Sequence, residues 1–290
     1  MTYEKTQVKL QSQVEKVLGT VWLPQEDMFT FKIKRELAKE NLPFGDPGTF
    51  IPLKPTKRLI LSKLASVFDP IGAGAAVLVK PKIAMQKLWQ IGLGWDDEVP
   101  PEIKRKRMTL FEEMIALNNV RLKRCLTPPN ACGDPSLIVF SDASRQAFGA
   151  CAYVQWKLKD GRFGVRFAAA KCRVAPLKEL TIPCLELQAA VLASRLGSNI
   201  VEKSRFKFER IRYFSESLVT LSWIRSESRS FKPLLSCRVG EIQSKTKPAD
   251  WFHCPTMLNV ADDLTKGILV EAMNGRWFNG PKFLPQGEEF

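Results

Sequence analysis

The stretch IRYFSESLVTLSWIRS, residues 211–226, indicates the fold class of this chain and raises a question about its function. Its apolar start is typical of a buried strand, and the amphipathic end predicts a short helix directly after it. Such a strand followed at once by a helix indicates an α/β fold. Between the two elements stands Ser215-Glu216-Ser217, a carboxylate flanked by two small hydroxyl residues. Three other acids of the chain occupy comparable places, so the four are interpreted together.

The composition indicates a basic globular protein. A chain of 290 residues is long enough for two domains, and 45% hydrophobic and 26% charged residues are ordinary values. The formal net charge of +14 is not ordinary. It favours a polyanionic partner such as nucleic acid, although a basic excess can also be only a solvated surface.

Cysteine and histidine usage excludes several kinds of site. The seven cysteines are odd in number and form no Cys-x-x-Cys pair, which argues against a disulfide framework and a zinc finger. The only histidine, His253, cannot build a multi-His zinc site, so any chemistry depends mainly on carboxylates. The polar start and the lack of a long apolar run predict an intracellular protein, cytoplasmic or nuclear, with no membrane partner.

The first 125 residues predict a hairpin followed by helices. Residues 17–33 contain an apolar run, a turn and a period-two segment, and the proline- and glycine-rich stretch 41–55 is interpreted as a linker. Helices are expected before Asp69-Pro70, over 81–91 with Trp89 facing inward, and over 101–117. The basic cluster of the last helix is either a solvated face or a contact for a phosphate backbone.

The remainder predicts a strand-rich domain. Residues 126–136 carry three prolines and a glycine and form the clearest boundary of the chain. The elements expected after it are a strand ending near Asp142, two antiparallel strands joined by the turn Asp160-Gly161, a long helix from about Pro183, the strand and helix of residues 211–224, a strand within 249–254 and a last helix from about Asp262.

Four acids stand at the ends of these elements. Asp142 and Glu216 each end a strand, Glu186 lies on the first turn of the long helix, and Asp262 opens the last helix. If the two strands are adjacent and parallel, Asp142 and Glu216 emerge at the same edge of the sheet, where the helix also places Glu186. One acid in such a place is usually a helix cap or a surface charge. Four in this order are far more specific.

Clustered carboxylates repel one another and are costly to bury unless a cation lies between them. Mg²⁺ prefers oxygen ligands and keeps waters that substrate phosphates can replace. Two such ions about 4 Å apart can stabilise the attacking and leaving oxygens of a phosphoryl displacement. The four acids therefore predict a site for Mg²⁺ or Mn²⁺. We expect the small Ser215 and Ser217 to leave room for substrate beside Glu216.

These stretches resemble the C-terminal part of BEL/Pao-type retrotransposon polyproteins. The matching segments lie between Lys16 and Gly267 and read KVLGTVW, TKRLILSKLASVFDPIG, LIVFSDAS, TIPCLELQAAVLASRL, FSESLVTLSWIRS and NVADDLTKG. The resemblance implies the end of a reverse transcriptase over 1–55 and a helical connection region over 56–125. It further implies an RNase H-like domain with a mixed five-stranded sheet over 136–270, followed by a C-terminal tail over 271–290.

The resemblance also implies a reaction and its residues. Family motifs place catalytic, metal-binding acids at Asp142, Glu186, Glu216 and Asp262. His253 resembles the mobile histidine that assists product release or proton transfer in RNase H enzymes. The implied activity is hydrolysis of RNA in RNA–DNA hybrids with two Mg²⁺ ions, so the expected partner is such a hybrid.

The chain departs from the family pattern in three ways. The third acidic motif is Ser-Glu-Ser where the family has Ser-Asp-Ser, and the extra methylene displaces the carboxylate by roughly 1 Å. Such a shift can weaken or abolish a site for Mg²⁺, which demands near-ideal octahedral geometry. The last motif has Asn-Val-Ala-Asp in place of Asn-Pro-Ala-Asp. No Tyr-x-Asp-Asp polymerase motif occurs. The Asp-Thr-Gly or Asp-Ser-Gly signature of an aspartic protease is also absent, although the family is often labelled a Pao retrotransposon peptidase.

Two alternatives stay open at this point. The chain could be a retroelement fragment that has lost catalysis and still binds nucleic acid, with binding that weakens steeply in salt. It could also be a DNA-processing, transposase-like nuclease on the same fold, because fold alone does not decide the chemistry. The sequence gives no indication of the oligomeric state.

Overall fold

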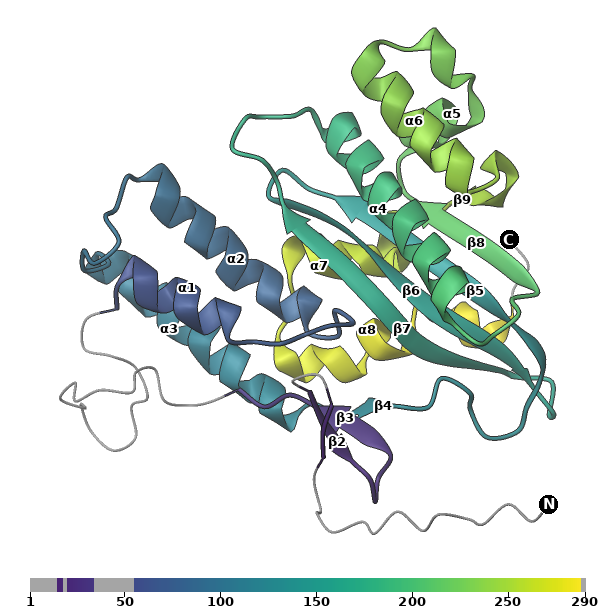
Figure 1. Cartoon of the computed structure of the whole chain (residues 1–290), viewed down its shortest axis with the longest axis horizontal. Helices are drawn as coiled ribbons and strands as arrows, with labels where there is room; N and C mark the ends of the chain where they lie inside the picture. The colour runs from purple at the N-terminus through teal and green to yellow at the C-terminus, as the bar shows by residue number, and fades with distance from the viewer. Residues whose placement is uncertain (1–14, 18–19, 34–54, 288–290) are drawn as a thin grey trace, which may run out of the picture.

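The computed structural model describes residues 15–17, 20–33 and 55–287, so the expected linker at 41–55 lies almost entirely outside the described residues. The described strands form a small sheet of order β1-β2-β3-β4 and a larger sheet of order β7-β6-β5-β8-β9. Figure 1 shows the larger sheet with α4 across one face and α7 and α8 across the other, while α1, α2 and α3 lie beside it.

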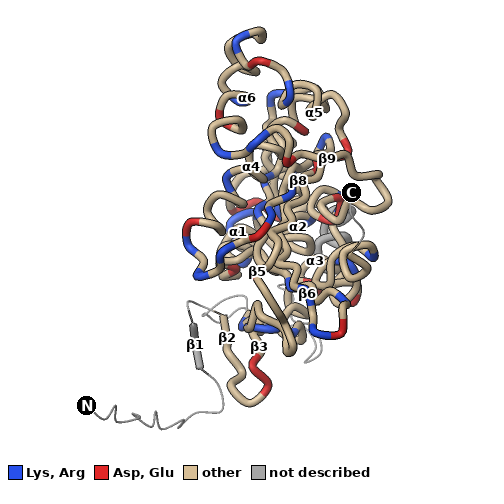
Figure 2. Tube along the Cα trace, turned by 90° about the vertical axis from the view of Figure 1, so that its right-hand side faces the viewer, with Lys and Arg blue, Asp and Glu red and all other residues tan. Residues whose placement is uncertain are grey.

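The small sheet confirms the expected hairpin. Its strands are β1 (Glu15–Val17), β2 (Thr20–Leu23), β3 (Met28–Thr30) and β4 (Leu122–Lys123), all paired antiparallel. The sequence did not predict β4, which is only two residues long and follows the helical region. Figures 1 and 2 both place the small sheet at the opposite end of the molecule from α5 and α6.

Three helices follow the hairpin: α1 (Lys57–Ala65), α2 (Ala75–Gln90) and α3 (Pro101–Ala116). The prediction for α2 was wrong at its start, because Pro81 lies inside the helix and a wholly buried apolar turn precedes it. The inward placement of Trp89 was also wrong. Its side chain is 46% exposed and packs edge-on against Trp95.

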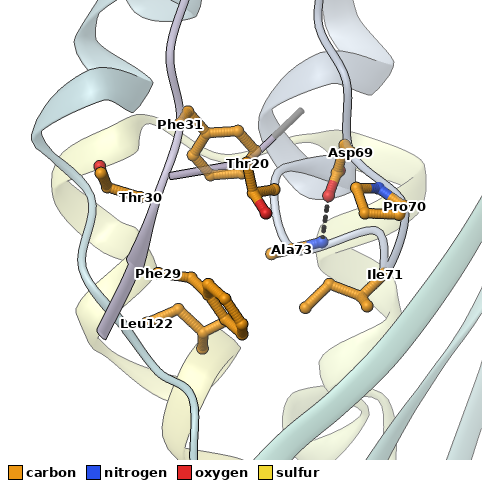
Figure 3. A pocket seen from close by; sticks show the side chains of 9 residues that line it. All are labelled: Thr20, Phe29, Thr30, Phe31, Asp69, Pro70, Ile71, Ala73 and Leu122. Carbon is orange, nitrogen blue, oxygen red and sulfur yellow. Dashed lines mark hydrogen bonds between the residues drawn. The ribbon is translucent and has the colours of Figure 1, made fainter. Parts of the chain in front are cut away.

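A tight loop between α1 and α2 joins the helical region to the larger sheet. The carboxylate of Asp69 accepts hydrogen bonds from the backbone N–H groups of Ala73 (2.8 Å) and Gly74 (2.9 Å), and the first of these bonds is drawn in Figure 3. The backbone N–H of Ala170, on the edge strand β7, donates to the carbonyl of Ile71 at 2.7 Å. The loop therefore covers part of an otherwise open sheet edge.

Gly72 makes this close approach possible. Its φ is +75°, and a Cβ at this position would lie 2.0 Å from the carbonyl oxygen of Ala170. Only glycine combines that backbone conformation with such a contact. The loop can therefore approach β7 this closely only with glycine at position 72.

The larger sheet is a mixed five-stranded sheet with helices on both faces, the α/β arrangement that the resemblance implied. Its strands are β5 (Ala131–Ala143), β6 (Ala147–Leu158), β7 (Phe163–Val174), β8 (Arg210–Ser215) and β9 (Trp251–His253). Strands β5, β6 and β7 form an antiparallel meander, whereas β8 is parallel to both β5 and β9. Strand β5 begins inside the proline-rich boundary segment, and its register shifts between Cys132 and Ser136.

The two faces of the sheet carry separate cores. Leu137 and Val139 of β5 pack with α4 (Ile182–Lys203), while the alternate residues Ile138 and Phe140 face the other side. That other side is covered by α2, α7 (Asp263–Lys266) and α8 (Arg276–Asn279). This alternation is the period of two expected of a strand that is buried on both faces.

The remaining helices are α5 (Leu218–Arg225), as predicted, and α6 (Pro233–Lys245), which the sequence did not predict. The 3₁₀ turns are η1 (Leu117–Asn119), η2 (Ser228–Ser230), η3 (Pro248–Asp250), η4 (Thr256–Leu258), η5 (Val260–Asp262), η6 (Val270–Asn274) and η7 (Leu284–Gln286). No described helix has the length and apolar character needed to cross a bilayer. All seven cysteines are free thiols.

The segment expected as a C-terminal tail packs into the core. The Trp277 side chain is fully buried, and its indole N–H donates to the carbonyl of Ala73 at 2.7 Å. The hydroxyl of Tyr153, on β6, donates to the carbonyl of Trp277 at 2.7 Å. Residues of α8 thus link the central sheet to the loop that precedes α2.

Candidate active site

The strand register brings Asp142 and Glu216 to the same edge of the sheet. Strands β5 and β8 are parallel, and their last aligned pair is Ser141 with Ser215. Asp142 and Glu216 are the next residues of each chain segment. The two strands thus meet the condition under which the sequence places these two acids at one edge.

Asp142 is held in a buried, negatively charged environment. It is 4% exposed, and its Oδ2 accepts a hydrogen bond from the Thr265 hydroxyl at 2.6 Å. Burial is the main cause that raises the pKa of Asp142 to about 7; the charges of Glu216 and Asp262 act in the same direction, and the Thr265 hydrogen bond opposes them. Asp142 thus interacts electrostatically with two of the other three predicted acids, Glu216 and Asp262.

Glu186 joins this edge through Ser217. The Ser217 hydroxyl donates to Glu186 Oε2 at 2.5 Å and accepts from the backbone N–H of Thr220 at 3.1 Å. Ser217 is thus the N-cap of α5 as well as the partner of Glu186. Ser215 is also buried, and its hydroxyl accepts from the backbone N–H of Ser217 at 3.2 Å. The two serines therefore fix the local structure, which differs from the expectation that they leave open space.

Glu216 contains the most unusual oxygen of the site. Its Oε2 is buried, and within the described part of the chain it has no hydrogen-bond partner. The Glu216 charge also contributes to the pKa of the neighbouring Cys254 thiol, which burial raises to about 12. A buried carboxylate oxygen without a donor is costly, so this position suits a cation.

Two cationic side chains, those of Lys266 and Arg276, lie close to Asp262. The Lys266 ammonium lies 2.8 Å from Asp262 Oδ1 and 2.9 Å from Oδ2. Arg276 forms two hydrogen bonds with the neighbouring Asp263, at 2.6 and 3.1 Å, and lies 3.8 Å from Asp262. The pKa of Lys266 is raised first by its hydrogen bond with Asp262 and also by the charges of Asp142 and Glu216. Lys266 is thus a counter-ion of the acid cluster.

The buried Asn259 ties Asp262 to the central strand. Its side-chain amide donates to the carbonyl of Ser141 at 3.0 Å, and its carbonyl oxygen accepts from the backbone N–H of Ala261 at 3.2 Å. This arrangement caps the turn that contains Asp262 and holds it beside the residue that precedes Asp142.

His253 lies at the same edge on the outer strand. It is exposed, and in β9 it is aligned with Ser215, the residue before Glu216. The structure therefore places the four predicted acids and the histidine around the ends of β5, β8 and β9.

The donor set suits a hard divalent cation, although the side chains are engaged elsewhere. Among the described residues, no group of three or more His, Cys, Asp or Glu side chains is arranged to hold a metal ion. Glu186, Asp142 and Asp262 are each bonded to a hydroxyl or an ammonium group, and only Glu216 has a buried oxygen without a partner. Four carboxylates match the oxygen preference of Mg²⁺ and Mn²⁺, provided that these side chains rotate toward the ion.

Sequence reasoning missed the residues that hold the acids. Ser217 was read only as a small neighbour, and Asn259, Thr265 and Lys266 were not assigned a role. For Thr265 and Lys266 the available signal was their spacing, because they stand three and four positions after Asp262 and so share its helical face. An apolar cavity of about 170 Å³ between the small sheet and the loop at Asp69 contains none of the candidate acids (Figure 3).

Known structures resemble parts of the chain. The foamy viral protease–reverse transcriptase in complex with double-stranded DNA matches with 16% identity and a TM-score of 0.47, covering 84% of this chain and 38% of that one. An N-terminal RNase H domain from Mycobacterium tuberculosis, fused to maltose-binding protein, matches with 15% identity and a TM-score of 0.33, covering 48% and 94%. LC11-RNase H1 in complex with an RNA/DNA hybrid matches with 16% identity and a TM-score of 0.32, covering 47% and 99%.

The family of the chain follows from a separate comparison. No curated protein matches the chain. Residues 56–217, more than half of the chain, match the family described as Pao retrotransposon-like RNaseH-like domain. The match includes Asp142, Glu186 and Glu216 and ends before His253 and Asp262. The chain belongs to the Pao retrotransposon-like RNaseH-like domain family.

Proposed function

We propose that this chain is an RNase H-type nuclease that hydrolyses the RNA strand of RNA–DNA hybrids with two Mg²⁺ or Mn²⁺ ions. The observation that carries the proposal is the pairing of Asp142 with Glu216 at one sheet edge. The pKa of the Asp142 carboxyl is raised to about 7, and Glu216 has a buried oxygen without a hydrogen-bond partner. Bringing a divalent cation between them relieves both costs.

In this proposal Asp142, Glu186, Glu216 and Asp262 hold the metal ions. The bound ions would stabilise the attacking and leaving oxygens of the phosphodiester. Ser217 holds Glu186, Thr265 holds Asp142 and Asn259 holds Asp262. Such supporting hydrogen bonds fix the orientation of the ligating carboxylates.

His253 is proposed to move a proton or to assist the release of product. Its exposure and its alignment beside the strand of Glu216 support this role, because a mobile group must reach both the site and the solvent. We expect His253→Ala to slow turnover while leaving Mn²⁺ affinity unchanged. An equal loss of Mn²⁺ affinity would instead make His253 part of the metal site.

The same proposal assigns the parts of the chain. Residues 1–55 are the end of a reverse transcriptase-like region, 56–125 the connection region and 136–270 the RNase H-like domain. Residues 271–287 are added to that domain, since the buried Trp277 bonds to both its central sheet and the loop before α2.

A second candidate function is nucleic-acid binding without cleavage. Two observations favour it. Glu216 stands where the family pattern has an aspartate, and the Lys266 ammonium already neutralises Asp262. A chain of this kind would bind nucleic acid through its basic surface and need no metal.

Metal titration separates the two functions. Isothermal titration of Mn²⁺ into the chain should show binding that Asp142→Asn abolishes. Asp134→Asn is the matched control, because Asp134 is an exposed acid on the same strand β5. If the unmodified chain binds no Mn²⁺ at millimolar concentration, the nuclease proposal fails and the binding function stands.

A further inference from the structure

Three neighbouring elements of the structure carry positive charge without any acid. Helix α1, helix α2 and strand β7 each contain three Lys or Arg residues and no Asp or Glu. Helix α2 packs against both α1 and β7. In a chain with 30 acidic residues, this separation of charge defines a distinct surface.

The surface is hollowed on both sides of the edge strand β7. One open hollow of about 270 Å³ lies between α1, α2 and β7 and is lined by Lys82 and Lys171. A second, of about 320 Å³, lies between β7 and α4 and is lined by Lys171, Arg173 and Arg195. The two hollows share Lys171 and Cys172, so the cations follow one continuous path across the edge of the sheet.

Three of these cations are available for a ligand. Lys82, Lys171 and Arg173 are exposed, and among the described residues none of them forms a side-chain ion pair. The acid that lines this path is Asp69, whose buried carboxylate accepts backbone N–H groups. The Lys82 charge acts on Asp69 and lowers its pKa, against the larger raising effect of burial. Arg195, by contrast, is paired with Glu241 at 2.5 Å.

The path lies level with the candidate active site. Cys172 is aligned with Gly149 on β6, and Gly149 is aligned with Asp142 on β5. Two strand spacings separate Cys172 from Asp142, which is about 10 Å. One turn of a nucleic-acid duplex is about 34 Å long, so a duplex that lies at Asp142 and runs toward β7 is long enough to reach the path.

We propose that Lys82, Lys171 and Arg173, named here the β7 surface, bind the phosphate backbone of a duplex whose scissile region lies at Asp142. Only the placement of the scissile region at Asp142 rests on the proposed function; the binding of the phosphate backbone does not. The contacts are electrostatic and independent of base sequence, because ammonium and guanidinium groups at an open strand edge meet phosphate oxygens and no base edges. The β7 surface thus extends the footprint of the duplex beyond the acid cluster.

The test is the salt dependence of duplex binding. Fluorescence anisotropy of a labelled RNA–DNA hybrid of about two helical turns is measured in EDTA, so that no cleavage occurs. The variant is Lys82→Gln/Lys171→Gln/Arg173→Gln. The control, Lys157→Gln/Lys159→Gln/Lys207→Gln, removes the same charge from exposed lysines near the start of β5 and β8, at the other end of these strands from Asp142.

A plot of log affinity against log salt concentration has a negative slope. We expect this slope to become less steep by about three in the β7 variant and to stay unchanged in the control. Thermal melting should show the same fold for both variants. An unchanged slope in the β7 variant, or an equal change in both variants, would overturn the proposal.

Cleavage is measured separately, in Mg²⁺ and Mn²⁺, on the same unmodified chain. A less steep slope confined to the β7 variant supports the β7 surface even if the unmodified chain does not cut the hybrid. Cleavage by the unmodified chain together with an unchanged slope overturns the β7 surface and leaves the nuclease proposal intact.

Discussion

The Ser217 hydroxyl lies 2.5 Å from Glu186 Oε2 and at the same time caps helix α5. One small side chain thus connects the first turn of α4 with the end of β8, where Glu216 stands. The serine that follows the strand is therefore a positioning residue for an acid on a different element.

Replacing Ser217 should affect both stability and metal binding. Ser217→Ala removes the cap, which costs about 1 kcal/mol of unfolding free energy, and frees Glu186 from its partner. Loss of such a supporting bond lowers metal affinity about 10- to 100-fold, which Mn²⁺ titration measures. Ser217→Thr should restore the affinity. Ser226→Ala, which removes a hydroxyl from the other end of α5, should leave it unchanged.

The stability of the metal-free chain should depend on pH through Asp142. Its pKa is raised from 3.8 to about 7, so the folded chain binds more protons than the unfolded chain between these values. The contribution of Asp142 to stability is therefore fully present below about pH 4 and is lost as pH rises to about 7, by at most about 1.4 kcal/mol per pH unit.

Thermal melts in EDTA between pH 5 and 8 measure this dependence. Asp142→Asn should flatten it, and saturating Mn²⁺ should also reduce it by favouring the ionised carboxylate. A melting temperature that falls with rising pH to the same extent in the unmodified chain and in Asp142→Asn would contradict the assignment of the effect to Asp142.

Lys266 should compete with metal ions at the acid cluster. Its ammonium lies within 3 Å of both Asp262 oxygens, and its side chain is 65% exposed. An exposed ion pair of this kind contributes up to about 1 kcal/mol, so Lys266→Gln should tighten Mn²⁺ binding by up to about fivefold. Lys203→Gln, at the far end of α4, is the control. Weaker Mn²⁺ binding in Lys266→Gln would show that the ammonium supports the site.

The contact between the loop at Gly72 and strand β7 should be disrupted when Gly72 gains a side chain. Gly72→Ala adds a Cβ 2.0 Å from the Ala170 carbonyl oxygen at a φ of +75°. Gly133→Ala is the matched control, because Gly133 has a φ of +70° and open space around the added carbon. Chemical unfolding should show a loss of about 1–2 kcal/mol for Gly133→Ala and a larger loss for Gly72→Ala. Equal losses would mean that the contact with β7 is not essential.

The sequence predicted the parts of the site that follow from strand geometry. Adjacent parallel strands bring their ends to one edge, so the positions of Asp142 and Glu216 at strand ends predict a shared edge once β5 and β8 are paired in parallel, as the structure shows. The residues that hold the acids were not predictable in the same way. The bond from Thr265 to Asp142 joins positions 123 residues apart, and no local pattern indicates it.

Other differences also have physical reasons. The start of α2 is apolar on all sides because it is buried between α3, β7 and α7, so it lacks the periodicity that marks a surface helix. Trp277 becomes part of the core only through contacts with distant elements, and its short helix of four residues gives no periodic signal. Long-range packing of this kind is invisible to a reading of local sequence.

The central claim is that Asp142 and its neighbouring acids form a metal-dependent nuclease site. Cleavage of a labelled RNA–DNA hybrid in Mg²⁺ and then Mn²⁺ tests it most directly, with the unmodified chain, Asp142→Asn and Glu216→Asp compared side by side. We expect metal-dependent cleavage by the unmodified chain, abolished in Asp142→Asn and retained or increased in Glu216→Asp. Cleavage that survives in Asp142→Asn, or no cleavage by either the unmodified chain or Glu216→Asp, would contradict it.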